Sequence, residues 1–193
     1  MLCQKKNTEK NMISEPTHND IVNLDKKNIM NFNDLSSIKS FGFTGFKKNS
    51  ELFLNHSAIP KVMGVYLVLS TDESLPELVA KGTGGAFKGK DPNVSIDQLK
   101  RNWVENTHVI YIGKAGGSTS NATLHSRLKQ YLRFGQNSNV GHWGGRYIWQ
   151  IKDSRNLIIC WIPTVEDPRE VEIKLIQDFI KEYSKLPFAN LTS

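Results

Sequence analysis

The stretch MGVYLVLS, residues 63–70, decides the fold because its side chains alternate as they do in a β-strand. The odd-numbered residues from Met63 to Leu69 fall on one side, and Tyr66 and Val68 fall on the other. The run HVIYIG, residues 108–113, is rich in β-branched and aromatic residues and predicts a second strand. Residues 71–107 separate the two strands.

Beyond these strands the sequence predicts helices and a second pair of strands. Gly135 ends one amphipathic pattern, and Asp167 with Pro168 begins another as helix cap and first helical residue. The predicted helices lie at 96–103, 121–135 and 167–186, and a predicted β-hairpin at 146–151 and 157–162. The main order β-β-α-β-β-α indicates a small α/β (α+β) sandwich, with an antiparallel or mixed sheet of three to four strands flanked by helices.

Composition indicates one globular domain with an N-terminal tail. Residues 1–34 are rich in Asn and Lys without periodicity and predict a polar, disordered tail. Residues 35–193 form the predicted domain, in which FGFTGF, residues 41–46, is expected to be a packed loop. No apolar run reaches the ~18 residues of a membrane span, and no secretory signal opens the chain. We therefore expect a cytoplasmic protein without a membrane partner.

The positive charge is concentrated in the middle of the chain. Residues 81–155 hold twelve Lys and Arg against four acidic residues, which gives +8, whereas residues 156–193 hold four against six, which gives −2. Such a basic region is typical of proteins that bind polyphosphates, although scattered solubilising lysines produce the same count.

One acidic residue falls on the apolar face of the last predicted helix. On a helical wheel the apolar set 171–183, which includes Ile173, is centred almost on Glu172, whereas Glu170 points to solvent. Burying an unpaired carboxylate costs several kcal/mol, on the order given by transfer data, so Glu172 should have a partner. That partner is a metal ion, a shared proton, or a cation in a structural ion pair.

Arg127 shows the same feature on the helix predicted at 121–135. It falls beside the apolar arc, between Tyr131 and Phe134, whereas Lys129 and Arg133 lie on the far side. Such an arginine either extends to solvent at the edge of the core or holds a phosphate through its planar guanidinium.

Three other motifs do not support a site. Gly84 to Lys90 approaches a phosphate-binding loop, but Asp91 follows instead of Ser or Thr, so we interpret this segment as a flexible basic loop. Glu172 and Lys174 would need a strand to share a side, but the local period is helical. The histidines lack metal-ligand spacing. His142, in the glycine-rich GHWGGR, either contacts a base or phosphate or belongs to a hinge or to a folded lead-in to the hairpin.

Five short motifs, taken together, resemble the GIY-YIG nuclease superfamily over roughly residues 60–191. They occur in the order of the family: Gly64-Val65-Tyr66, Tyr111-Ile112-Gly113, LHSRL around Arg127, EIKLI around Glu172, and PFAN ending at Asn190. The form YIGKA, with Lys114, resembles the excision-repair nuclease subunit and several restriction enzymes. The chain departs from the family in the length of its 71–107 insertion, and no separate DNA-binding module is found.

The resemblance implies a metal-dependent DNA endonuclease with one divalent cation, Mg²⁺ or Mn²⁺, held by Glu172. It implies the catalytic set Tyr66, Tyr111, Arg127, Glu172 and Asn190, with Lys114 as an auxiliary. Tyr66 is the first choice for the residue that positions or deprotonates water, with Tyr111 as the alternative, and Asn190 is expected to orient Glu172 or a water. The expected contacts to double-stranded DNA are Lys81, Lys88, Lys90, Lys129, Arg133, His142 and Arg146.

Two other functions remain open. The same fold can bind DNA without cutting it, and a basic protein can bind RNA instead. A retained set of Tyr, Arg, Glu and Asn favours catalysis, because pure binding does not need a buried acid. A monomer and a homodimer are equally compatible with the sequence.

Overall fold

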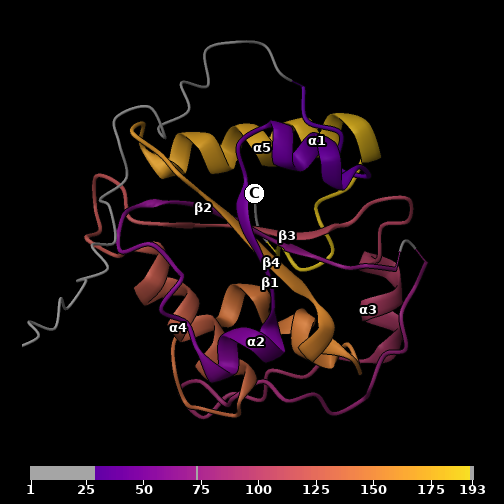
Figure 1. Ribbon diagram of the computed structural model, residues 1–193. Helices are drawn as coiled ribbons and strands as arrows, with labels where there is room; N and C mark the ends of the chain where they lie inside the picture. Colours follow the sequence, from indigo (N-terminus) through magenta and orange to yellow (C-terminus); the bar gives the residue numbers. More distant parts are fainter. Residues whose placement is uncertain (1–28, 73, 192–193) are drawn as a thin grey trace, which may run out of the picture.

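The computed structural model describes residues 29–72 and 74–191, which form a four-stranded antiparallel sheet flanked by helices (Figure 1). The strand order is β1-β4-β2-β3, and each neighbouring pair is antiparallel. The strands are β1 (Thr44–Lys48), β2 (Gly64–Leu69), β3 (Val109–Ala115) and β4 (Ile158–Pro163). The predicted α+β class is therefore confirmed, with the strand expected at 63–70 in the interior of the sheet.

Helices cover both faces of the sheet. Helices α5 (Pro168–Tyr183) and α1 (Leu35–Ser40) lie on the upper face in Figure 1, and α4 (Leu124–Gly135) and α2 (Asn49–Leu54) lie below. The side chains of β2 divide as predicted. Val65 and Leu67 belong to the core beneath α5, whereas Tyr66 and Val68 belong to the core that contains the apolar face of α4.

The three predicted helices are confirmed, together with the predicted cap at Asp167 and the predicted end at Gly135. The Asp167 side chain accepts a hydrogen bond from the backbone N–H of Arg169 and caps α5, which has Pro168 in its first turn. Thr123 caps α4, and α4 ends at Gly135 as predicted. The short helix α3 (Ile96–Asn102) lies in the insertion between β2 and β3.

The predicted hairpin is wrong in its first strand, at 146–151, whereas its second strand, at 157–162, is confirmed as β4. Residues 143–150 form a 3-10 helical segment, η2 (Trp143–Gln150), which is followed by η3 (Ser154–Asn156). Residues 147–151 are all buried, so this apolar run is enclosed on every side instead of alternating as an edge strand would.

Strand β4 pairs instead with β1, within a segment where a packed loop was expected. Gly45 has a φ of +94°, and a Cβ there would lie 2.6 Å from the Trp161 ring, so glycine is required by both backbone and packing. The register of β1 shifts between Thr44 and Lys47. The partner strand is more than one hundred residues away and the register is irregular. The local sequence of β1 therefore does not show the alternation of apolar and polar residues that predicts a strand.

The N-terminal boundary also differs from the prediction where the structure describes it. Residues 1–28 of the predicted tail lie outside the described residues. Met30 and Phe32 are buried, and the ring of Phe32 packs edge-on against Phe179 at 5.1 Å between centroids. Asp34 caps α1. Residues 30–34 therefore belong to the folded domain.

The insertion is attached to the rest of the domain rather than free. The buried Gln150 amide accepts a hydrogen bond from the Val94 N–H at 2.8 Å and donates to the Val79 carbonyl at 3.1 Å. The Thr83 N–H donates to the Trp149 carbonyl, and the Gly85 N–H donates to the Phe134 carbonyl. The segment predicted as a flexible loop is thus held against η2 and the end of α4. Across the described residues, no helix has the length and apolarity needed to span a membrane.

Candidate active site

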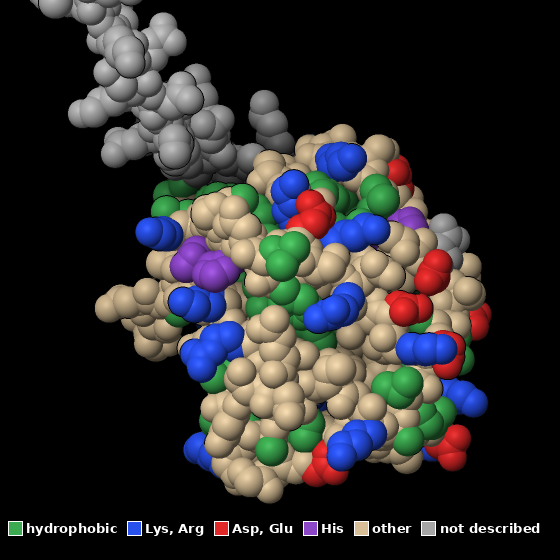
Figure 2. Space-filling view, turned by 60° about the horizontal axis from the view of Figure 1, so that its bottom comes forward, with side chains coloured by type: hydrophobic (Ala, Val, Ile, Leu, Met, Phe, Trp, Pro, Cys, Tyr) green, Lys and Arg blue, Asp and Glu red, His purple; other side chains and the backbone are tan. Residues whose placement is uncertain are grey.

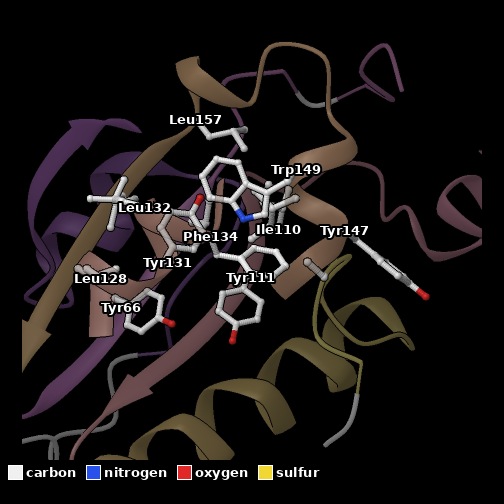
Figure 3. Close-up of a cluster of buried hydrophobic side chains, with 14 of the residues drawn as sticks. Tyr66, Ile110, Tyr111, Leu128, Tyr131, Leu132, Phe134, Tyr147, Trp149 and Leu157 are labelled. Atoms are coloured by element: carbon white, nitrogen blue, oxygen red, sulfur yellow. The ribbon is translucent and has the colours of Figure 1, made fainter. Parts of the chain in front are cut away.

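Tyr66 and Tyr111 lie next to each other on neighbouring strands of the sheet. Their ring centroids are 6.0 Å apart, and Figure 3 shows both within one buried cluster. Gly113 stands opposite Tyr66 in the strand register, and a Cβ at Gly113 would lie 2.6 Å from the Tyr66 hydroxyl oxygen. The glycine of the second motif is therefore needed to make room for the tyrosine of the first.

The two phenols differ in their surroundings. Tyr66 is completely buried, its hydroxyl has no hydrogen-bond partner among the described residues, and burial raises its pKa well above the ordinary value. Burial also raises the pKa of Tyr111, and the positive charge of Arg127 partly opposes that rise. Tyr111 lines a cavity of about 370 Å³, whereas Tyr66 lies behind it. Of the two phenols, Tyr111 is thus the one that faces the cavity.

Glu172 faces the same cavity from α5. Its side chain is partly buried among the apolar residues of the helix, with Val171 and Leu175 in the core, as the wheel predicted. Ile173 departs from that prediction, since it is 40% exposed. Glu170 is exposed, as expected. The buried arc therefore spans less of the helix than predicted, and Glu172 remains within it.

The carboxylate of Glu172 has cations nearby but no direct partner. Burial raises its pKa, and the charges of Lys114, Arg127 and Arg169 act in the opposite direction. Among the described residues it forms neither an ion pair nor a hydrogen bond at contact distance. It is the only acidic side chain lining the cavity, as far as the described part of the chain shows. The carboxylate of Glu172 is therefore available to a ligand in the cavity.

Arg127 is held in place on the wall of this cavity. Its Nη1 donates to the Gly141 carbonyl oxygen and to the Gln130 Oε1, both at 3.2 Å. Gln130 could have been suspected from its i+3 position on α4, but a backbone carbonyl such as that of Gly141 leaves no mark in the sequence. Lys114 also lines the cavity, and its Nζ donates to the Gly116 carbonyl oxygen at 3.2 Å.

Asn190 lies near this site, but its side chain is engaged elsewhere. Its Oδ1 accepts from the Ile112 N–H at 2.9 Å, and its Nδ2 donates to the Ile112 carbonyl oxygen at 2.8 Å. The N–H of Ala189 donates to the Ile110 carbonyl oxygen. Both polar atoms of the Asn190 amide are thus engaged with Ile112, and no hydrogen bond from it to Glu172 occurs among the described residues. Asn190 braces the outer edge of β3 beside Tyr111.

His142 is not a surface contact for DNA. It is 1% exposed, and its ring packs edge-on against Tyr131 at 5.1 Å and Tyr111 at 6.1 Å. Burial, reinforced by the charge of Arg127, lowers its pKa to about 3. The glycines around it suggested an accessible side chain. Gly141 and Gly144 are indeed exposed, but His142 itself points into the domain. A Cβ at Gly144 would lie only 3.8 Å from the Tyr111 hydroxyl oxygen.

The remaining cations predicted to contact DNA lie on three different elements: α4, η2 and the insertion. Lys129 and Arg133 are exposed on its outer side, as predicted. Arg146 is partly buried and stacks over the rings of Trp143 and Tyr147. Lys81, Lys88 and Lys90 are exposed on the insertion, whose Gly85 N–H is bonded to the Phe134 carbonyl near the C-terminal end of α4. Figure 2 shows Lys and Arg side chains distributed over the side that carries α2 and α4.

Comparison with known proteins gives no match: no protein-family model, no curated protein and no solved structure is significantly similar to this chain.

Proposed function

We propose that this chain is a DNA endonuclease of the GIY-YIG type, which hydrolyses phosphodiester bonds with one divalent cation. The observation that carries the proposal is the cavity in which the unpaired carboxylate of Glu172 faces Arg127, Lys114 and Tyr111. A carboxylate beside several cationic donors suits a phosphodiester together with a metal ion.

The residues of the cavity fit a hard divalent cation such as Mg²⁺ or Mn²⁺. Such ions prefer oxygen ligands and keep several waters, so one carboxylate and an open volume of about 370 Å³ are sufficient. The raised pKa of Glu172 reflects the cost of burying its charge, and a bound cation would offset that cost. When bound, the cation would stabilise the negative charge on the leaving oxygen.

The other side chains have distinct proposed roles. Arg127, fixed by Gly141 and Gln130, presents its free N–H groups to the phosphoryl oxygens, where charge builds in the transition state. Lys114 adds a second positive charge. Tyr111, which lines the cavity, positions the attacking water. Its raised pKa keeps the phenol neutral, so it acts as a hydrogen-bonding group in its resting state.

Tyr66 supports Tyr111 from behind. It was the first choice for the water-activating residue, but its hydroxyl is completely buried and lies outside the lining of the cavity. We therefore assign the substrate-facing role to Tyr111 and the packing role to Tyr66.

Incubation of the purified protein with supercoiled plasmid tests this proposal. We expect nicked or linear DNA with Mg²⁺ or Mn²⁺ and no change with EDTA, since the site has one carboxylate for a divalent cation. Plasmid that is bound but uncut with either metal would contradict the proposal and favour a DNA-binding module. Preference for RNA in competition would favour the RNA-associated alternative.

A further inference from the structure

A second and larger cavity lies at the opposite end of α4 from Arg127. It has a volume of about 960 Å³, it is open to solvent, and it is lined by the insertion, the C-terminal end of α4, η3 and α2. The residues that decide its chemistry are Lys81, Thr83, Asn137, Lys152 and Arg155. It shares no lining residue with the cavity of Glu172.

We propose that this cavity is a second phosphate-binding site, which holds the DNA backbone several base pairs from the bond that is cut. The inference rests on the proposed function, because it names where a DNA substrate extends beyond the active site. It assigns to the insertion a function of its own.

The charges of the cavity favour an anion. Lys81, Lys152 and Arg155 line it, against a single acidic residue, Asp91. Lys152 is paired with Glu77 at 2.7 Å, outside the lining. The guanidinium of Arg155 lies over the Phe53 ring at 5.6 Å and forms no ion pair within the described residues. Lys81 also forms no ion pair at contact distance, although its charge helps to lower the pKa of Asp91 in the same lining. Two cations are thus available to phosphate oxygens, and the Phe53 ring holds one of them in place.

The end of α4 does not oppose an anion there as strongly as an open helix end would. The C-terminal carbonyls of a helix carry partial negative charge. Here the Phe134 carbonyl accepts from the N–H groups of Gly85 and Asn137, and the Arg133 carbonyl accepts from those of Gln136 and Ser138. Because these N–H groups satisfy the carbonyls, the negative end of the helix is largely neutralised at the cavity wall.

The cavity is also preformed. Its insertion wall is fixed by Gln150, by the Thr83 N–H bonded to the Trp149 carbonyl, and by the Gly82 N–H bonded to the Asn93 side chain. A preformed wall loses little conformational entropy when a ligand binds. The side chains of Lys81 and Arg155 are therefore presented from a stable frame.

The position of the cavity suits a continuous DNA strand. Arg127 and Gly135 are eight residues apart on α4, which corresponds to about 12 Å along the helix axis. Lys129 and Arg133 are exposed between them. At about 3.4 Å of duplex axis per nucleotide of a strand, this distance spans roughly three to four nucleotides. A strand that runs along α4 can therefore reach both cavities, although Lys129 and Arg133 project from a different side of the helix than Arg127.

The test compares DNA binding by two double variants at several salt concentrations, in EDTA so that no cleavage interferes. Lys81→Gln with Arg155→Gln removes the two cations of the cavity. Lys174→Gln with Lys181→Gln removes two exposed cations from α5, on the other face of the sheet, and is the matched control. We expect the first variant to lower the slope of log affinity against log salt by about 2, since each phosphate contact contributes about 0.9. The control should keep the wild-type slope.

An unchanged slope in the Lys81/Arg155 variant, or an equal change in the control, would overturn the site. Binding of pyrophosphate and of a free nucleotide to the wild type and to the Lys81/Arg155 variant is measured separately by calorimetry. Saturable binding of either, lost in the variant while the DNA slope stays constant, would assign the cavity to a small phosphate ligand and overturn the DNA assignment. If the wild-type protein never cuts DNA but the Lys81/Arg155 variant shows the expected lower slope, the nuclease proposal fails and this site stands.

Discussion

Glu172 occupies a position where a carboxylate destabilises the folded chain. Its neighbours on the buried side of α5 are apolar, and burial raises its pKa despite three nearby cations. Natural sequences tolerate such a cost mainly where the group has a function. The same reasoning does not apply to Glu170, which is exposed two residues earlier.

This placement predicts a pH-dependent gain in stability from Glu172→Gln. Below the unfolded value of 4.5 the carboxyl is protonated in both states. Between 4.5 and the raised folded pKa the unfolded state loses its proton first, so wild-type stability falls as pH rises through that window. Gln removes this loss. We expect the Tm of Glu172→Gln to be about 2–4 °C higher than that of the wild type at pH 7.5, which corresponds to roughly 1 kcal/mol of unfolding free energy in a chain of this size. The difference at pH 4 should be smaller.

Calorimetry without divalent metal measures this effect, with Glu170→Gln as the control. Because Glu170 is exposed, its variant should match the wild type at both pH values. A lower Tm for Glu172→Gln at pH 7.5 would show that the carboxylate is stabilised by a partner inside the fold.

His142 shows how far a single residue can depart from its sequence context. Its glycine-rich surroundings suggested an accessible loop, yet both of its ring nitrogens are buried without partners among the described residues. Its neighbour Gly141 supplies the carbonyl that holds Arg127. The segment therefore contributes to the site by supporting Arg127 and Tyr111 from within the domain.

At the scale of elements, the sequence was informative where burial follows a local period. Strands β2 and β3 and helices α4 and α5 were predicted from alternation, helical wheels and capping residues, all of which depend on near neighbours. Strand β1 was missed because its partner β4 is more than one hundred residues away, and Gly45 is required only by Trp161. Segment η2 was misassigned because consecutive apolar residues do not distinguish an enclosed 3-10 helix from a strand.

The candidate site was predictable to a similar degree. The wheels singled out Glu172 and Arg127 from burial alone, whereas Tyr66, Tyr111, Lys114 and Asn190 were named only through the family resemblance. The partner of Asn190 could not be predicted, because it is the backbone of Ile112 and depends on how the C-terminal segment returns to β3.

The brace on β3 gives a prediction for Asn190→Ala. The change removes two hydrogen bonds and leaves the N–H and carbonyl of Ile112 without partners at a sheet edge. We expect a loss of about 2–3 kcal/mol in unfolding free energy, the usual range for two such bonds with buried partners. Hydrogen exchange should quicken at the Ile112 amide, whereas the Cys160 amide, in the interior of the sheet, should change only with global stability. Unchanged exchange at Ile112 would contradict the brace.

At the scale of the whole molecule, the position of β3 explains how the candidate site is assembled. Because β3 is the edge strand, a residue of α5 on one face and a residue of α4 on the other can reach the same cavity around it. Glu172 and Arg127 meet in this way, with Tyr111 and Lys114 supplied by the edge strand itself. An interior strand would keep the two helical layers apart.

The most direct test of the proposed chemistry compares Glu172→Gln with Glu170→Gln in cleavage and in DNA affinity. Cleavage is measured with Mg²⁺ at saturating DNA, and affinity is measured without metal. We predict that Glu172→Gln loses detectable cleavage while its Kd stays within about 3-fold of wild type, since one lost charge changes nonspecific binding little, and that Glu170→Gln behaves as wild type. Near-wild-type cleavage by Glu172→Gln, or damage confined to Glu170→Gln, would contradict the assignment of the metal site.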